Sequence, residues 1–195
     1  MQIKKDDTKS KIRESAKEIF FTTSYAGASM RDVASKCNMT VGNIYRYYEN
    51  KEVLFDDIIK PTYDGVVKLI KITDLMKPFI KGKPVDSENK LYKNSKFKNY
   101  IISSIATIVS CHAVELYILL NNSEGSKYEN TTDRIYKLMH ETISKMVIGI
   151  PDERTDVYAF VAITTVSYLL KKYVKDPEKL QEEVKFFFEK LFASI

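Results

Sequence analysis

Residues 29–55 read SMRDVASKCNMTVGNIYRYYENKEVLF. The stretch contains two start signals for short helices. Ser29, followed three residues later by Asp32, forms a capping box, because the hydroxyl and the carboxylate can satisfy backbone amides that a helix start leaves unpaired. Thr40 is a second N-cap residue and predicts a helix over residues 41–47. Two short helices joined by a three-residue turn are typical of a helix-turn-helix.

Helical periodicity continues on both sides of this pattern. A first helix carries its apolar residues on one face, at Ile12, Ala16, Ile19 and Phe20. Gly27 is predicted to adopt the left-handed conformation past the end of that helix. A fourth helix starts after Asn50, and we expect a kink or break near Pro61, because proline removes a backbone donor and clashes with the preceding turn.

The rest of the chain is also predicted to be helical. We expect a loop over 77–95 and helices over 97–121, 129–147, 152–174 and 177–193. The helix over 97–121 is apolar nearly all round, so it is predicted to be a central buried helix. The fold class is therefore all-α, with an N-terminal three-helix helix-turn-helix domain over residues 1–51 and a helical body over residues 52–195.

Positive charge is concentrated near the N-terminus. Residues 1–51 hold ten Lys/Arg and six Asp/Glu, so they carry +4 of the chain's net charge of +5. A basic domain joined to a nearly neutral body is the asymmetry expected when one domain contacts nucleic acid. An ordinary solvated surface is the alternative explanation for so small an excess.

Several other classes of protein lack support in the sequence. No apolar run reaches the length of a membrane span, and the N-terminus lacks an apolar signal core, so we expect a cytoplasmic protein. Cys37 and Cys111 are far apart and fit no metal spacing. His112 and His140 are the only histidines, and no phosphate-binding glycine loop occurs. We expect no catalytic residues, no metal, no cofactor and no enzymatic activity.

The helix-turn-helix segment resembles the DNA-binding signature of the TetR family of transcriptional regulators. The resemblance rests on the helix boundaries and on Ser29, Val33, Ala34, Gly42, Tyr45, Tyr48, Lys51, Glu52 and Leu54, and residues 11–27 fit the family's first helix. Asn38 occupies the turn in which the family usually has glycine, and asparagine tolerates the left-handed conformation that glycine would supply. Pro61 in the fourth helix is also unusual for the family.

The residue types in this segment predict how it would contact DNA. Thr40, Val41, Gly42 and Asn43 form the exposed first turn of the recognition helix, which would enter the major groove. Gly42 would permit close approach, while Asn43 and Val41 would meet base edges. The other predicted contacts are to phosphates, with Arg46 able to reach either guanine or phosphate: Ser29, Arg31, Tyr45, Arg46, Tyr47 and Lys51. Ile44 and Tyr48 are expected to pack inward.

The family resemblance implies that the body binds a small molecule and forms a dimer. Candidate ligand contacts are polar residues in the predicted apolar helix over 97–121: Ser104, Thr107, Cys111, His112 and Glu115. Serine and threonine can instead bond to their own helix backbone. The apolar stripes of helices 152–174 and 177–193 predict a homodimeric four-helix bundle, with an intramolecular core as the alternative.

The leading hypothesis is a homodimeric repressor that a small-molecule effector releases from a palindromic double-stranded DNA operator, with Pro61 as a hinge. A small enzyme and a helical protein-interaction module on the same scaffold are the alternatives. The interaction module would not need the Tyr, Arg and Lys side chains of residues 40–51, which are present here.

Overall fold

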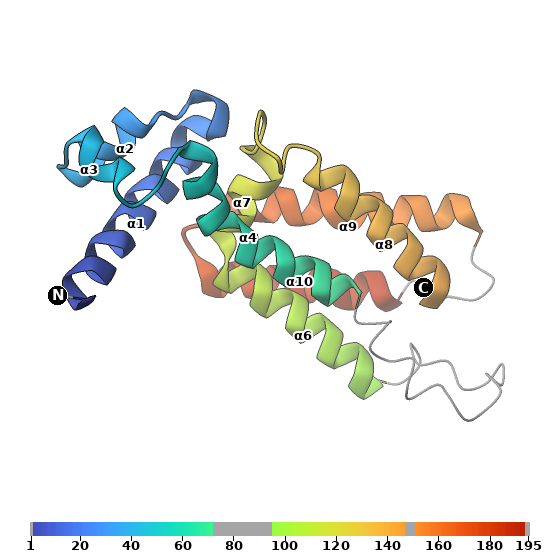
Figure 1. The fold of residues 1–195 in the computed structure, drawn as a ribbon. Coiled ribbons are helices and arrows are strands. Elements are labelled where there is room, and N and C mark those ends of the chain that lie inside the picture. The colour runs from blue at the N-terminus through green and yellow to red at the C-terminus, as the bar shows by residue number, and fades with distance from the viewer. Residues whose placement is uncertain (1, 72–94, 147–150, 194–195) are drawn as a thin grey trace. The chain divides into compact units, whose positions relative to one another are not determined.

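The structure is a computed structural model, and it describes residues 2–71, 95–146 and 151–193. Every regular element in these ranges is a helix, which confirms the all-α prediction (Figure 1). The helices are α1 (Gln2–Gly27), α2 (Met30–Cys37), α3 (Val41–Tyr45), α4 (Lys51–Ile70), α6 (Ser95–Cys111), α7 (Ala113–Asn121), α8 (Thr131–Met146), α9 (Asp152–Tyr173) and α10 (Pro177–Ala193). The predicted loop over 77–95 lies almost entirely outside the described residues.

The chain forms two compact units. The first contains Met1–Tyr63 and Val114–Thr131, and the second contains Asp64–Ala113 and Thr132–Ile195. The chain therefore passes from the first unit to the second within α4, and it returns to the first unit for α7 and the loop that follows. We predicted a boundary between two domains at residue 51. A division into compact units does not test where a domain ends, so this boundary stays a prediction.

The core of the first unit forms where the apolar face of α1 meets α2 and α4. Ile12, Ala16 and Phe20 are completely buried, as the periodicity predicts. The Phe20 ring meets the Phe55 ring edge to face, with their centroids 4.9 Å apart. Figure 1 shows the short α2 and α3 beside α1. These contacts provide the fixed base on which α3 is held.

Residues 114–131 are an integral part of this first unit. The Asn122 side-chain amide donates to the carbonyls of Phe20 (3.0 Å) and Phe21 (2.8 Å), and the Asn122 carbonyl accepts from the amide of Tyr25 (2.8 Å). Asn122 therefore satisfies backbone groups where α1 ends.

The second unit is built around α10. This helix packs against both α6 and α9, and Figure 1 shows α6 running alongside it. Leu180, Val184 and Phe188 recur at helical spacing and are buried along one face. The predicted helices over 152–174 and 177–193 are confirmed to within one residue.

Pro61 does not break α4, which excludes one of the two expected outcomes, while a kink at this position stays a prediction. The helix continues from Lys51 to Ile70 with Pro61 inside it. Ile58, Ile59 and Thr62 are buried around this position, whereas Pro61 is exposed. Packing of the buried face holds the helix together, and water can satisfy the carbonyl that loses its donor on the exposed face.

The predicted helix over 97–121 is two helices, which corrects the single buried helix expected there. Helix α6 ends at Cys111 and α7 begins at Ala113, with His112 between them. The two helices belong to different units, so the apolar residues of this segment enter two cores. A segment that is apolar on all sides can be one central helix or two helices in separate cores, and the sequence pattern is the same in both cases.

Two smaller predictions about helix ends are also wrong. Helix α3 ends at Tyr45 rather than at residue 47, because the chain turns there and Tyr47 and Tyr48 both donate to the Ile44 carbonyl. Gly27 has no positive φ; the left-handed residue near the end of α1 is Ser24, with φ 64° and ψ 170°.

No single helix in the described ranges is long and apolar enough to cross a membrane. The consecutive segments Asn99–Cys111 and Ala113–Asn121 meet the length and composition requirement only when taken together.

Candidate nucleic-acid interface

The predicted capping box starts α2. The Ser29 hydroxyl accepts from the Asp32 amide (3.2 Å), while the Asp32 carboxylate accepts from the Ser29 amide (2.9 Å) and hydroxyl (2.6 Å). Hydrogen bonds from Ser29 hold the pKa of Asp32 below its ordinary value. The backbone amide and the hydroxyl of Ser29 thus both hold the start of α2. The Arg31 side chain nearby is exposed.

Asn38 makes the turn between α2 and α3. Its backbone is left-handed, with φ 54° and ψ 47°, which confirms the predicted role of asparagine at this position. The amide of Met39 donates to the Ala34 carbonyl over 2.9 Å and closes the end of α2. The turn therefore follows from local residue chemistry.

Helix α3 is held from one side and open on the other. Thr40 caps it by accepting from the Asn43 amide (3.3 Å). Ile44 is completely buried and Tyr48 is 2% exposed, which confirms that both pack inward. Gly42 lies on the outer side, where an added Cβ would meet no atom within 4 Å.

The predicted DNA contacts gather around this open side with different degrees of exposure. Six are exposed: Ser29, Arg31, Thr40, Gly42, Tyr45 and Arg46. Four are half-buried: Val41, Asn43, Tyr47 and Lys51. The Tyr45 side chain is 50% exposed. A surface of this kind suits a groove of DNA, but contact by each residue remains a prediction.

Lys51 has an internal role that the sequence did not predict. Its ammonium donates to the carbonyls of Tyr25 (2.7 Å) and Ala28 (2.9 Å) and lies 4.2 Å from the centre of the Tyr25 ring. Two of its three donors are therefore used to fix the end of α1 and the residue after it to the start of α4. One donor remains for the predicted phosphate contact.

The five predicted ligand contacts do not converge on one described cavity. Cys111 and His112 are exposed where α6 ends, and the Thr107 hydroxyl accepts from the Gln181 amide over 3.4 Å. Ser104 is half-buried on α6. Glu115 belongs to the first unit, where its carboxylate pairs with Lys17 over 3.0 Å. An effector site made from these residues remains a prediction.

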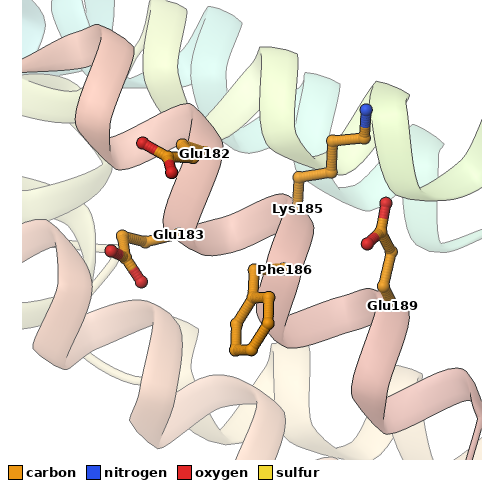
Figure 2. Close-up of a pocket in the computed structure, with 5 residues that line it drawn as sticks. All are labelled: Glu182, Glu183, Lys185, Phe186 and Glu189. Carbon is orange, nitrogen blue, oxygen red and sulfur yellow. The ribbon is translucent and has the colours of Figure 1, made fainter.

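A hollow of about 420 Å³ lies on the second unit, along α10 (Figure 2). It is lined by Glu182, Glu183, Lys185, Phe186 and Glu189. Figure 2 shows that all five side chains leave the same helix. Because four of them are exposed, this is a surface groove rather than an enclosed site for a small molecule.

Sequence reasoning assigned no role to two residues that shape the interface. Asn122 lies far along the chain from the helix-turn-helix, and Asp57 lies within an ordinary amphipathic helix. Asp57 accepts from the Tyr48 hydroxyl over 2.7 Å. No local pattern marks either residue, because both act through contacts that only the folded chain creates.

Residues 12–58 match the family model described as "Bacterial regulatory proteins, tetR family". Residues 12–58 are therefore similar to the regulatory proteins of the TetR family. The matched region starts in α1, includes the whole helix-turn-helix and ends in α4. The description of this family names regulatory proteins, which is the class of protein that the sequence predicts.

A curated relative supports the same assignment over part of its length. The chain is 31% identical over 67 residues to "Probable HTH-type transcriptional regulator YttP" of Bacillus subtilis. The match covers 34% of this chain and 32% of that protein, so the chain matches about a third of the relative.

Solved structures share the fold over nearly the whole chain. A TetR-like transcriptional regulator from Rhodococcus has a TM-score of 0.63 at 13% identity, covering 95% of this chain and 93% of that one. A transcriptional regulator from Aquifex aeolicus has a TM-score of 0.59 at 19% identity, covering 94% and 99%. NalD of Pseudomonas aeruginosa, a repressor of the MexAB-OprM efflux pump, has a TM-score of 0.54 at 15% identity, covering 97% and 96%.

Proposed function

We propose that this protein is a TetR-type regulator: a cytoplasmic, homodimeric repressor that binds a palindromic DNA operator through α3 and is released by a small molecule. The observation that carries the proposal is the construction of α3. Ile44 and Tyr48 are buried and pack this segment against the core. Gly42, Tyr45 and Arg46 are exposed and are not part of that core.

Gly42 provides the sharpest test of DNA contact. Among the described residues, none lies within 4 Å of a Cβ added at Gly42, and glycine costs a helix about 1 kcal/mol relative to alanine. Close approach of DNA would explain its presence. Gly42→Ala should therefore keep or raise stability and weaken binding to an operator selected from a random DNA pool by at least about tenfold, as the loss of one good base contact would.

Gly65→Ala is the matched control, because an added Cβ at Gly65 also meets no atom within 4 Å. It should bind the selected operator as the unchanged protein does. Fluorescence anisotropy with labelled operator would measure both affinities. Equal operator binding by the two alanine variants would argue against DNA contact at Gly42, and failure of the unchanged protein to enrich any sequence would refute the operator proposal itself.

The proposed dimer uses the outer faces of α9 and α10. Val157, Phe160, Val161 and Tyr168 follow one face of α9 and are exposed, and Phe186 is exposed on α10. By contrast, Leu169, Val184 and Phe188 are buried within the chain. Part of the predicted apolar stripe thus belongs to the intramolecular core, and the remainder is available to a second copy.

Sedimentation equilibrium tests this interface. Phe160→Lys should convert the dimer to monomer, because a buried unpaired charge strongly opposes association. Tyr100→Lys is the matched control, since Tyr100 on α6 is 61% exposed, the same fraction as Phe160. The proposed face is ruled out if the Phe160 variant remains dimeric.

A further inference from the structure

Asp57 of α4 is the centre of a polar cluster that joins three parts of the first unit. Its Oδ2 atom accepts a hydrogen bond from the Tyr48 hydroxyl over 2.7 Å. The same oxygen lies 3.5 Å from Lys9 Nζ and 3.5 Å from Arg13 Nη1, both on α1. One carboxylate on α4 therefore links α1 to Tyr48, which lies three residues beyond the end of the recognition helix α3.

The interactions in this cluster differ in strength. Tyr48 is 2% exposed, so its hydroxyl is removed from water and donates to a charged acceptor, which makes a strong hydrogen bond. The Lys9 and Arg13 side chains are 47% and 40% exposed, and ion pairs of that kind contribute little. Burial and then the hydrogen bond to Asp57 raise the pKa of Tyr48 well above its ordinary value, so the hydroxyl keeps its proton.

Helix α3 needs such an external anchor. It has five residues, far fewer than a helix requires for stability on its own. Of its two buried anchors, Ile44 makes apolar contacts, which have no preferred direction. The hydrogen bond from Tyr48 to Asp57 is directional. A phenylalanine at position 48 would fill the same space without fixing the end of α3 to one carboxylate.

We propose that Asp57 is a positioning residue for operator recognition: by holding the Tyr48 hydroxyl, it sets the orientation in which α3 presents its outer face to bases. The inference rests on the proposed DNA-binding function. Asp57 itself touches no DNA in this scheme. Loss of the hydrogen bond should therefore impair the choice of sequence while leaving contacts to phosphates intact.

Tyr48→Phe and Asp57→Ala remove the hydrogen bond from its two ends. Each should lower affinity for the selected operator about tenfold, the scale of one misplaced base contact, with little change in affinity for random DNA. The ratio of the two affinities should therefore fall by the same factor. The salt dependence of operator binding should not change, because no phosphate contact is lost.

Asp57→Asn is the conservative variant. Its side-chain amide oxygen can still accept from Tyr48 but no longer pairs with Lys9 or Arg13, so it should retain most of the affinity ratio. In the DNA-free protein, two-dimensional NMR should show displaced amide resonances for α3 in Tyr48→Phe and smaller displacements in Asp57→Asn. This second measurement does not depend on operator binding.

The inference is overturned if Tyr48→Phe and Asp57→Ala keep the affinity ratio of the unchanged protein. It is also overturned if affinities for operator and random DNA fall together, because that is the result of a smaller folded fraction alone. If the unchanged protein selects no operator, the proposed function is refuted. The NMR measurement on the DNA-free protein would then still show whether Asp57 positions α3.

Discussion

Ser24 is expected to lower the stability of the protein, and replacing it with glycine should raise it. Its φ of 64° and ψ of 170° lie in a region that is essentially restricted to glycine. The conformation is imposed by its surroundings: the next residue, Tyr25, is 9% exposed, and its amide donates to the Asn122 carbonyl over 2.8 Å. Such a backbone conformation costs about 1–3 kcal/mol.

Two opposing effects reduce the expected gain from Ser24→Gly. Glycine has more freedom in the unfolded chain, which costs about 0.5–1 kcal/mol. The substitution also removes the Ser24 hydroxyl, which accepts from the Gly27 amide over 3.4 Å, too long to contribute much. The net expectation is a free energy of unfolding higher by about 0.5–2 kcal/mol, which for a chain of this size corresponds to a thermal midpoint higher by about 1–8 °C.

Urea unfolding followed by circular dichroism measures this change, and the slope against urea should be unaltered. Ser24→Ala is one control, because it removes the hydroxyl but keeps the Cβ atom, so it should give no gain. Thr23→Gly is another, because residue 23 lies in ordinary helix and should lose about 0.3–0.5 kcal/mol. Our account of Ser24 would be refuted if Ser24→Gly matched or fell below the unchanged protein.

Three further substitutions test other parts of the first unit and α4. Lys51→Met should reduce stability by about 1–3 kcal/mol, because its internal bonds are lost, and should lower the slope of DNA binding against salt by about one, because the predicted phosphate contact is lost; an unchanged slope would refute that contact. Burial raises the pKa of Asp56, but hydrogen bonds from Lys127 and Tyr128 outweigh it and leave that pKa lowered. A lowered folded-state pKa stabilises the protein above the unfolded value of about 3.9, and this contribution is lost as the pH falls through the folded value. Asp56→Asn should therefore be less stable than the unchanged protein at pH 7, and urea midpoints should converge in acid; a gap independent of pH would contradict this. Pro61→Ala should raise stability by about 1–3 kcal/mol, since α4 is continuous and alanine restores a backbone donor. A lower urea midpoint would show that Pro61 stabilises α4. If the effector still releases the Pro61→Ala variant from the operator to the same extent, Pro61 is not a hinge.

The helix ends that the sequence predicted correctly are set by local chemistry. Ser29, Thr40 and Asn50 each accept from the backbone amide three residues later. Such bonds depend on residues that are neighbours in the chain, so spacing alone reveals them. The inward packing of Ile44 and Tyr48 was predictable for the same reason. Once Thr40 is known to start the helix, the positions of Ile44 and Tyr48 relative to it indicate that they face inward.

The predictions that failed depend on contacts between distant residues. Pro61 does not interrupt α4, because the buried face of that helix holds it together. The segment over 97–121 divides at His112, because its two halves enter different units. The strain at Ser24 depends on Asn122, which lies about a hundred residues away.

The core around residues 1–51 is completed by side chains from beyond residue 51. The Phe55 ring packs against Phe20 and against Tyr25, at centroid distances of 4.9 Å and 4.7 Å. Asn122 satisfies the backbone where α1 ends, and the Tyr128 hydroxyl binds the Asp56 carboxylate. The chain must therefore leave the first unit and return before that unit is complete. A segment that ends at residue 51 would expose apolar rings and leave carbonyls unpaired, and either effect costs more than the loss of a surface contact.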